Sequence, residues 1–400
     1  DILKERKRPV ILSRALRDVR ISSRLTRFLR RDVAAPLNDR CSRRRYLLPQ
    51  IKPSKLPHMK LLKRMVRTKY FFTTLLASIG IALYLFYPRP YTFSGSTFGT
   101  YYKIIVVAPK LALNAKKTDQ RIQTILQELD GLYSTYRNDS ALSIMNTAHH
   151  TNTITLHPDL HALFVRSKQY YTRMDGAWDP CLLPLTQALG FTNAPAKTKL
   201  PDMTAYLGFK HVRILANNQV KKAHPKVACD LSSVAKGTAV DTLTDALNTW
   251  LVKGTYVDIG GEVRTTGAHA SGRQWQIGVQ SPVTMNALVG VVAANNLAMA
   301  TSGNYLNKVT DSAGNTVGHI LTPSNNGGAG EADPTLLSVS IQAETCELAD
   351  AVATGVFAMG ATKAKAWLTK NENVAALLVT QTKHGDIRVQ PYNGFLRRVF

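Results

Sequence analysis

The longest uninterrupted apolar pattern of the chain lies near its N-terminal end. The 18 residues of Tyr70–Tyr87 carry no charge, which meets the minimum length of a transmembrane helix and exceeds the apolar run of a usual core helix. Five basic residues precede this segment, namely Lys60, Lys63, Arg64, Arg67 and Lys69. No small-x-small cleavage site follows it, so we interpret residues 70–87 as an uncleaved signal anchor, with a cleaved signal peptide as the alternative. The basic flank then stays inside and everything after Arg89 is exported. The predicted location is a single-pass protein of the inner, cytoplasmic membrane that faces the periplasm.

Beyond residue 90, apolar residues repeat at helical spacing in three segments. Their faces are Ile122, Ile125, Leu126, Leu129 and Leu132, then Leu160, Leu163, Phe164, Ser167 and Tyr171, then Ala239, Val240, Leu243, Leu247 and Trp250. Six shorter runs are typical of strands: Tyr102–Val107, Tyr256–Ile259, Trp275–Gln280, Leu288–Ala293, Leu337–Gln342 and Val374–Thr380.

The order of these segments predicts the fold class. The strand-like runs cluster after residue 255 and do not alternate with helices, which favours an α+β fold over a doubly wound sheet. The only long loop that we expect is Thr322–Pro334, which is rich in Gly, Asn and Pro. No linker composition interrupts residues 91–400, so we treat them as a single compact domain.

Charge is concentrated at the N-terminal end. The 400 residues carry a net charge of +25, of which +17 lies in residues 1–69 and only +8 in the other 331. A nucleic-acid-binding protein usually carries its basic surface on the folded domain, so this distribution argues against a nucleic-acid partner. We interpret residues 1–58 as upstream sequence joined by a misplaced start, because Met59 opens a natural beginning for an exported protein. The alternative is a basic cytoplasmic tail that touches anionic lipid or nucleic acid.

Cysteines and common motifs narrow the function further. The chain has four cysteines, which are too few and too scattered for a disulfide scaffold, and none forms a C-x-x-C pair. They are Cys41, Cys181, Cys229 and Cys346. We expect the last three to be buried and inert, with at least one unpaired. The absence of P-loop, dinucleotide-binding, zincin and nucleophile-elbow motifs disfavours those enzyme classes.

Two segments suit a hard cation beside a phosphate. Asp350 and Thr354 lie four residues apart and share one face of a predicted helix. With Ser233 they offer the oxygen ligands that Mg²⁺ takes, and Lys236 at a helix start supplies a positive charge for an anion. From spacing alone, an ordinary capped helix and a buried Asp–Thr pair fit these residues as well. His319 is expected on a short apolar strand, where a histidine is more often a hydrogen-bonded core residue than a catalytic group.

An ordered series of short motifs resembles the FAD:protein FMN transferase family, known as ApbE, across nearly all of residues 91–400. The matching segments are Phe98-Gly99-Thr100, Ser134-Thr135-Tyr136, Trp178-Asp179-Pro180, Asp230 to Gly237, Asp258 to Glu262, Ala300 to Tyr305 and Ala349 to Thr354. Each motif is weak alone, whereas the order of the whole series is specific. The resemblance implies a single ApbE-like, T-fold-like catalytic domain.

The resemblance also implies roles for individual residues. It implies contacts with FAD, as substrate, at Phe98, Tyr136, Ala177, Trp178, Asp179, Asp230, Lys236 and Leu321. It implies Mg²⁺ at Ser233, Asp350, Thr354 and the Ala353 carbonyl, and it places His319, with Asp350, in the catalytic machinery. The chain departs from the family pattern at Phe98, at Leu183 and at Thr322-Pro323-Ser324, which stands in place of Asp-Pro-Arg/Gln.

The expected reaction is the Mg²⁺-dependent transfer of FMN from FAD to a Thr or Ser hydroxyl of another protein, with release of AMP. The expected acceptor is an exported or membrane flavoprotein such as a respiratory electron-transfer subunit. Two alternatives stay open: a Mg²⁺-dependent FAD pyrophosphatase that uses the same site with water, and an exported flavin-binding protein without turnover.

Overall fold

The computed structural model describes residues 57–191, 202–284, 286–304, 308–310, 316–323, 329–330 and 333–395. The chain divides after Tyr70 into two units, and the second, which begins at Phe71, contains the sheets and the remaining helices. Residues 1–56 lie outside the described residues, so the interpretation of the basic N-terminal segment stays a prediction.

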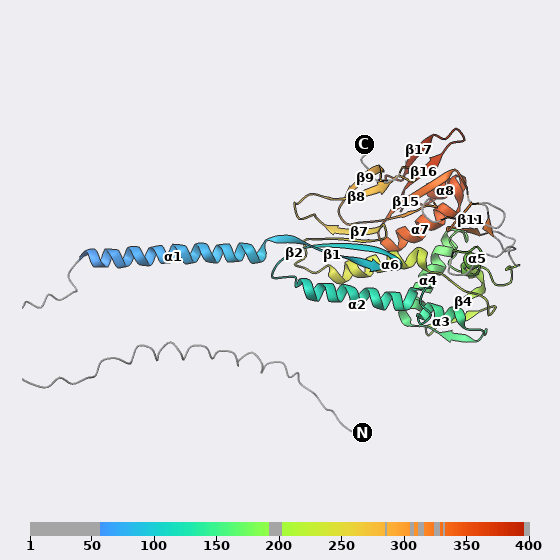
Figure 1. Cartoon of the computed structure of the whole chain (residues 1–400), viewed down its shortest axis with the longest axis horizontal. Helices are drawn as coiled ribbons and strands as arrows, with labels where there is room; N and C mark the ends of the chain where they lie inside the picture. The colour runs from blue at the N-terminus through green and yellow to red at the C-terminus, as the bar shows by residue number, and fades with distance from the viewer. Residues whose placement is uncertain are drawn as a thin grey trace, which may run out of the picture. The chain divides into compact units, whose positions relative to one another are not determined.

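The apolar segment near the N-terminus forms helix α1, Pro57–Phe86. Its part from Lys63 to Phe86, 24 residues, is long and apolar enough to cross a membrane, and none of the most apolar window is buried by the rest of the protein (Figure 1). An 18-residue helix already spans the hydrocarbon core of a bilayer, so α1 could serve as a membrane anchor.

The other helices are α2 (Ala115–Tyr133), α3 (Ala141–Thr147), α4 (Pro158–Arg173), α5 (Leu183–Ala188), the 3₁₀ turn η1 (Phe209–His211), α6 (Ser232–Leu247), α7 (Cys346–Ala358) and α8 (Gly360–Lys370). The first two predicted apolar faces are confirmed on α2 and α4. The third is wrong at its end, because Asn248 leaves the helical conformation and α6 ends at Leu247. Trp250 therefore lies in the following turn and is 87% exposed.

An eight-stranded antiparallel sheet forms the centre of the domain, in the order β1-β2-β6-β7-β10-β15-β16-β17. Its strands are β1 (Pro88–Thr97), β2 (Thr100–Pro109), β6 (Gly254–Ile259), β7 (Glu262–Gly267), β10 (Leu297–Ser302), β15 (Leu336–Ala343), β16 (Ala375–Gln381) and β17 (Ile387–Tyr392). The predicted strands in this sheet are confirmed to within two residues at their ends. The predictions missed β1, β7, β10 and β17, whose apolar alternation is weak.

Smaller sheets complete the fold. They consist of β3 (Thr153–Thr155), β4 (Val212–Leu215) and β5 (Gln219–Lys222) in one sheet, and of the pairs β8 (Trp275–Gln280) with β9 (Leu288–Ala294), β11 (Lys308–Thr310) with β12 (Thr316–Gly318), and β13 (Thr322–Pro323) with β14 (Ala329–Gly330). The expected long loop at 322–334 thus contains a short strand pair, and its other residues up to 332 lie outside the described part. The predicted α+β class is confirmed.

The two faces of the large sheet are covered by different layers. Alternate side chains of a strand point to opposite faces, and Ile259, Ala300 and Ile341 belong to a core shared with α6 and α7. Val263, Met299 and Leu377 point the other way, into a second core with the β8–β9 hairpin. Figure 1 shows α6 and α7 beside the sheet, and this packing fixes the two helices that carry most of the charged site residues.

One expectation about the cysteines is wrong. Cys181 and Cys229 form a disulfide across 48 residues of sequence, whereas Cys346 is free and buried as expected. The pairing of cysteines so far apart depends on the tertiary fold and cannot be read from their spacing.

Candidate active site

A cavity of about 760 Å³ opens where the β1–β2 turn, the β6–β7 turn, the start of α6 and the middle of α7 meet. It is lined by every residue expected to contact FAD, namely Phe98, Tyr136, Ala177, Trp178, Asp179, Asp230, Lys236 and Leu321. His319, Ser233, Asp350 and Thr354 line it too, whereas Ala353 is fully buried and is not among the lining residues. Segments from Phe98 to Ala358, 260 positions apart in the sequence, therefore meet at one cavity.

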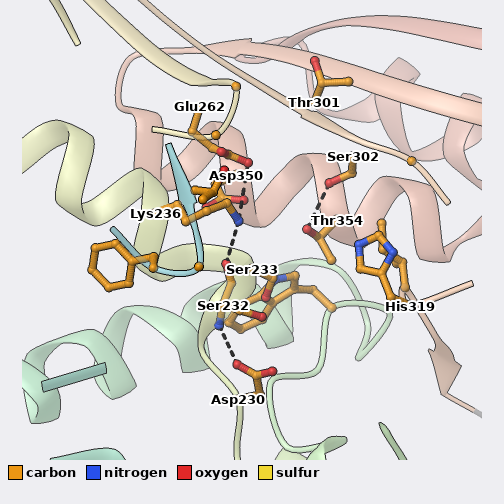
Figure 2. A pocket seen from close by; sticks show the side chains of 18 of the residues that line it. Asp230, Ser232, Ser233, Lys236, Glu262, Thr301, Ser302, His319, Asp350 and Thr354 are labelled. Atoms are coloured by element: carbon orange, nitrogen blue, oxygen red, sulfur yellow. Dashed lines mark hydrogen bonds and ion pairs between the residues drawn. The ribbon is translucent and has the colours of Figure 1, made fainter. Parts of the chain in front are cut away.

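A cluster of three charged side chains lies on one wall of this cavity. The Lys236 ammonium is 3.5 Å from a Glu262 carboxylate oxygen and also donates to the Ser232 carbonyl at 2.9 Å. Figure 2 shows Asp350 and Glu262 on one side of the ammonium and Ser232 on the other. Burial opposes the charge of Lys236, but the carboxylates of Asp350 and Glu262 outweigh it and raise the lysine pKa.

The two carboxylates of the cluster are buried at 2% and 5% exposure for Asp350 and Glu262. Burial raises the pKa of both carboxyl groups, and the charge of Lys236 opposes that shift. One oxygen of Glu262, Oε2, is buried and has no hydrogen-bond partner among the described residues. A buried carboxylate oxygen without a donor or a cation costs free energy, so Glu262 Oε2 is a free acceptor for a further donor or cation on this wall of the cavity.

The backbone of α6 also holds the Asp350 carboxylate in place. The Gly237 N–H donates to Asp350 Oδ2 at 3.0 Å. A side chain at Gly237 would collide with the Cys346 carbonyl and with Glu347 Cα, because α6 and α7 are in backbone contact there. Only glycine allows this approach, which explains its position directly after Lys236.

A second set of bonds fixes the start of α7. The Asp241 carboxylate accepts from the backbone N–H groups of Cys346 at 3.0 Å and Glu347 at 2.9 Å, and it pairs with Arg264 at 2.9 Å. Glu347 in turn accepts from Arg166 at 2.6 Å. A carboxylate at a helix N-terminus satisfies free N–H groups and complements the helix dipole. Both carboxylates therefore position the helix that carries Asp350 and Thr354.

Hydroxyl groups line the neighbouring wall. The Thr354 and Ser302 hydroxyls are 3.1 Å apart, and Ser233 on the first turn of α6 is half-buried in the cavity wall. The described part of the chain holds no group of three or more His, Cys, Asp or Glu that could bind a metal without other ligands. Mg²⁺ does not need one, because it takes one or two carboxylates and completes its shell with water and substrate phosphate oxygens. The donor set of Asp350, Thr354 and Ser233, beside the unsatisfied Glu262 oxygen, fits this ion.

His319 lies on the far side of Thr354 from Lys236 in Figure 2. It occupies a bend after β12, which corrects the expectation of a strand, and it is half-buried. The side chain of Asn304 holds the next residue at two points: its oxygen accepts from the Ile320 N–H at 3.0 Å and its amide donates to the Ile320 carbonyl at 3.3 Å. Asn304 thus fixes the backbone that presents His319.

Asp179 and Asp230 use their carboxylates to hold backbone. Asp179 Oδ1 accepts from the N–H groups of Cys181 at 2.8 Å and Phe209 at 2.9 Å, and Asp230 Oδ1 accepts from Ser232 at 2.8 Å. The Cys181–Cys229 disulfide joins the two loops beside these residues. Both carboxylates therefore hold the backbone that forms the cavity wall.

Aromatic residues complete the cavity. Phe98 has a φ of +48° at the β1–β2 turn, a conformation that bulky residues rarely adopt, and it is half-buried over the cavity. Tyr136 is 73% exposed at the rim, whereas Trp178 is 1% exposed and packs edge-on against Tyr170. Phe98 and Tyr136 can therefore contact a flat ligand from the open side, and Trp178 forms a fixed wall.

Sequence reasoning missed three residues of the site: Glu262, Ser302 and Asn304. All three stood within motifs that were already recognised, in Asp258 to Glu262 and in Ala300 to Tyr305. Their polar side chains at the ends of short strands, next to glycines, were the available signal.

Comparisons with known proteins agree on one family. The model of the ApbE family matches residues 98–378. The FAD:protein FMN transferase of Haemophilus influenzae is 30% identical over 305 residues, which cover 73% of this chain and 87% of the relative. The enzyme of the same name from Vibrio cholerae is 29% identical over 301 residues, covering 73% and 88%.

Solved structures give the same result. The flavin transferase ApbE from Vibrio cholerae superposes with a TM-score of 0.69 at 26% identity, over 77% of this chain and 98% of that structure. The apo form of the Pseudomonas stutzeri flavinyl transferase ApbE superposes with a TM-score of 0.68 at 26% identity, over 78% and 97%.

Proposed function

The chain belongs to the ApbE family of flavin transferases, and from this premise we propose that it transfers FMN from FAD to a threonine or serine hydroxyl of another exported protein, with release of AMP. The observation that carries the proposal is the cavity wall of Asp350, Glu262 and Lys236 beside the Thr354–Ser302 hydroxyl pair. This wall combines cation ligands with one fixed positive charge, which is what a pyrophosphate substrate requires.

We assign FAD to the cavity lined by Phe98, Tyr136, Ala177, Trp178, Asp179, Asp230, Lys236 and Leu321. In this arrangement Phe98 and Tyr136 face the isoalloxazine ring, since flat aromatic systems stack on one another. Lys236 is already positive and is held by the Glu262 carboxylate and the Ser232 carbonyl, so it can neutralise a pyrophosphate oxygen without reorganisation.

Mg²⁺ held by Asp350, Thr354 and Ser233 would supply the charge that stabilises a phosphoryl group during transfer. Asp350 is prepared for this role by its bond from Gly237, which leaves its other oxygen for a ligand. Thr354 is prepared by its hydroxyl contact with Ser302, which fixes the rotation of the threonine side chain.

The reaction forms a bond between the acceptor oxygen and the FMN phosphorus and breaks the bond to the AMP phosphate. The acceptor hydroxyl is a weak nucleophile at neutral pH and needs a base. We propose that His319 takes its proton, because histidine titrates near neutral pH and His319 lines the same cavity as Thr354. AMP then leaves with the electron pair of the broken P–O bond.

We further propose the topology of the chain: a basic N-terminal segment, residues 1–69, inside; a span at residues 70–87 in the inner membrane; and the catalytic domain, residues 91–400, in the periplasm. The length and apolar character of α1 support the span. The Cys181–Cys229 disulfide supports an oxidising compartment for the domain, since disulfides are rare in reducing cytosol. The expected partner is a flavoprotein of the same membrane or compartment, such as a respiratory electron-transfer subunit.

The test uses the full chain in detergent with FAD, Mg²⁺ and exported flavoprotein candidates as acceptors. We expect an acceptor band that fluoresces as flavin in a denaturing gel, and no such band with Asp350→Asn. A normal band with Asp350→Asn at limiting Mg²⁺ would refute the metal assignment. Free FMN and AMP without a labelled acceptor would identify a pyrophosphatase instead.

A further inference from the structure

The end of the catalytic domain nearest to α1 carries exposed apolar residues that the flavin-transfer site does not use. Leu111, in the turn between β2 and α2, is 62% exposed, and Trp250, in the turn between α6 and β6, is 87% exposed. We refer to residues 110–117 and 248–253 as the anchor-side surface. We infer that this surface docks the catalytic domain on the membrane, as a second contact in addition to the anchor α1. The inference rests on the proposed membrane span of α1.

The first of the two turns is bonded to the last turn of α1. The Leu111 N–H donates to the Leu85 carbonyl at 3.2 Å, and the Lys110 ammonium donates to the Tyr84 hydroxyl at 2.6 Å. Lys110 also lies 4.5 Å from the centre of the Tyr84 ring, and Arg89 lies 4.9 Å from it. If α1 spans the bilayer, its last turn lies at the headgroup level, where tyrosine is enriched. These bonds then hold the β2–α2 turn at the same level.

The second turn lies at the same edge of the sheet. The Lys253 N–H donates to the Val107 carbonyl at 2.8 Å, two residues before the end of β2. The start of β6 pairs there, with Gly254 opposite Val107. Trp250 is therefore carried by a loop that runs from the end of α6 to the start of β6, beside the last residues of β2. Figure 1 shows the end of α6 and the start of α2 at this end of the domain.

The charge and the exposed apolar residues of the anchor-side surface indicate what it binds. The anchor-side surface contains four lysines and no acidic residue. All four lysines, Lys110, Lys116, Lys117 and Lys253, are exposed. A basic surface with an exposed tryptophan and leucine matches a bilayer interface with anionic headgroups, where Trp sits between lipid tails and water. A soluble protein partner would not explain why these residues gather at the end of the anchor.

Docking would also fix the direction of the active site. The cavity is lined by Thr100, at the opposite end of β2 from Pro109. Nine residue steps along an antiparallel strand separate these ends by about 30 Å. The cavity would thus be held away from the lipid, in reach of acceptors that project from the membrane.

Tryptophan fluorescence tests the inference directly. The chain has four Trp, and three of them are buried: Trp178, Trp275 and Trp367 are 1%, 3% and 9% exposed. The full chain is reconstituted in vesicles of phosphatidylcholine and phosphatidylglycerol with brominated acyl chains, which quench tryptophan on contact. The emission of Trp250 is the difference between the unaltered protein and its Trp250→Phe variant. We expect the brominated chains to lower this emission roughly twofold, relative to the same lipids without bromine, because Trp250 lies at the interface.

Matched variants complete the experiment. Ile144 on α3 is also exposed, at 59%, but lies beyond the far end of α2. A tryptophan placed there by Ile144→Trp, in the Trp250→Phe background, should not be quenched. Lys110→Glu with Lys253→Glu should restore the emission of Trp250. If Trp250 is not quenched and the protein resists alkaline extraction from the vesicles, docking is wrong and the membrane anchor stands. If alkali extracts the protein, both docking and the anchor are wrong. The flavin-transfer assay is independent of either result.

Discussion

The Gly237 N–H and the Asp350 carboxylate form a 3.0 Å hydrogen bond between α6 and α7. The bond joins the residue next to Lys236 with the proposed metal ligand, so one close approach of two helices sets the distance between the two charges. The approach requires glycine, because a Cβ there would meet the backbone of α7.

Gly237→Ala should therefore separate the helices and displace Asp350. We expect a loss of about 1–3 kcal/mol of unfolding free energy, typical of overpacking, and a larger fractional loss of flavin transfer. Thermal unfolding and the gel fluorescence assay measure the two effects. Gly131→Ala is the control: Gly131 lies within α2 with open space around it, so alanine should stabilise the protein by about 0.5–1 kcal/mol. Equal behaviour of the two variants would contradict the steric argument.

Lys236→Met should expose the electrostatic role of the charged cluster. Without the ammonium, the Asp350 and Glu262 carboxylates are left buried side by side, which should cost about 3–5 kcal/mol of stability. Mg²⁺ should then raise the unfolding temperature of the variant more than that of the unaltered protein, because the cation replaces the missing charge. Calorimetry with and without Mg²⁺ gives both values. An equal Mg²⁺ effect on the two proteins would place the cation elsewhere.

His319→Ala should slow flavin transfer far more than it weakens FAD binding, because the base acts only during the reaction. Transfer rates and FAD titrations by fluorescence separate the two effects. A parallel loss of rate and affinity would make His319 a binding residue.

Asn304 should act as a positioning residue for His319, through its two bonds to Ile320. Asn304→Ala should lower the transfer rate by about 10–100-fold, as expected for a displaced base, with FAD affinity nearly unchanged. Asn304→Asp keeps the oxygen that accepts from the Ile320 N–H and should recover much of the rate. If aspartate gave no recovery, the bond to the N–H would not be the cause.

The Cys181–Cys229 disulfide should stabilise the cavity wall formed by Asp179 and Asp230. Replacing both cysteines by serine should lower stability by about 2–4 kcal/mol and weaken FAD binding. Dithiothreitol should lower the unfolding temperature of the unaltered protein and leave the double variant unchanged. Sensitivity of the double variant to the reductant would point to another thiol.

Much of the site followed from local sequence. The spacing of Asp350 and Thr354 predicted one helix face, and both residues line the cavity. The contact of Glu262 with Lys236 could not be predicted from spacing, because it depends on the β6–β7 turn returning the chain to α6. The disulfide has the same origin in tertiary structure. Trp250 fitted helical periodicity, but periodicity does not report that Asn248 ends the helix.

Flavin transfer is tested by comparing AMP release with acceptor labelling in one reaction. The full chain is incubated with FAD, Mg²⁺ and an acceptor, AMP is quantified by chromatography, and covalent FMN on the acceptor is quantified by mass spectrometry. We expect one AMP for each FMN attached to a Thr or Ser side chain, and neither product with Asp350→Asn. AMP and free FMN without a modified acceptor, across several exported flavoprotein candidates, would contradict this expectation.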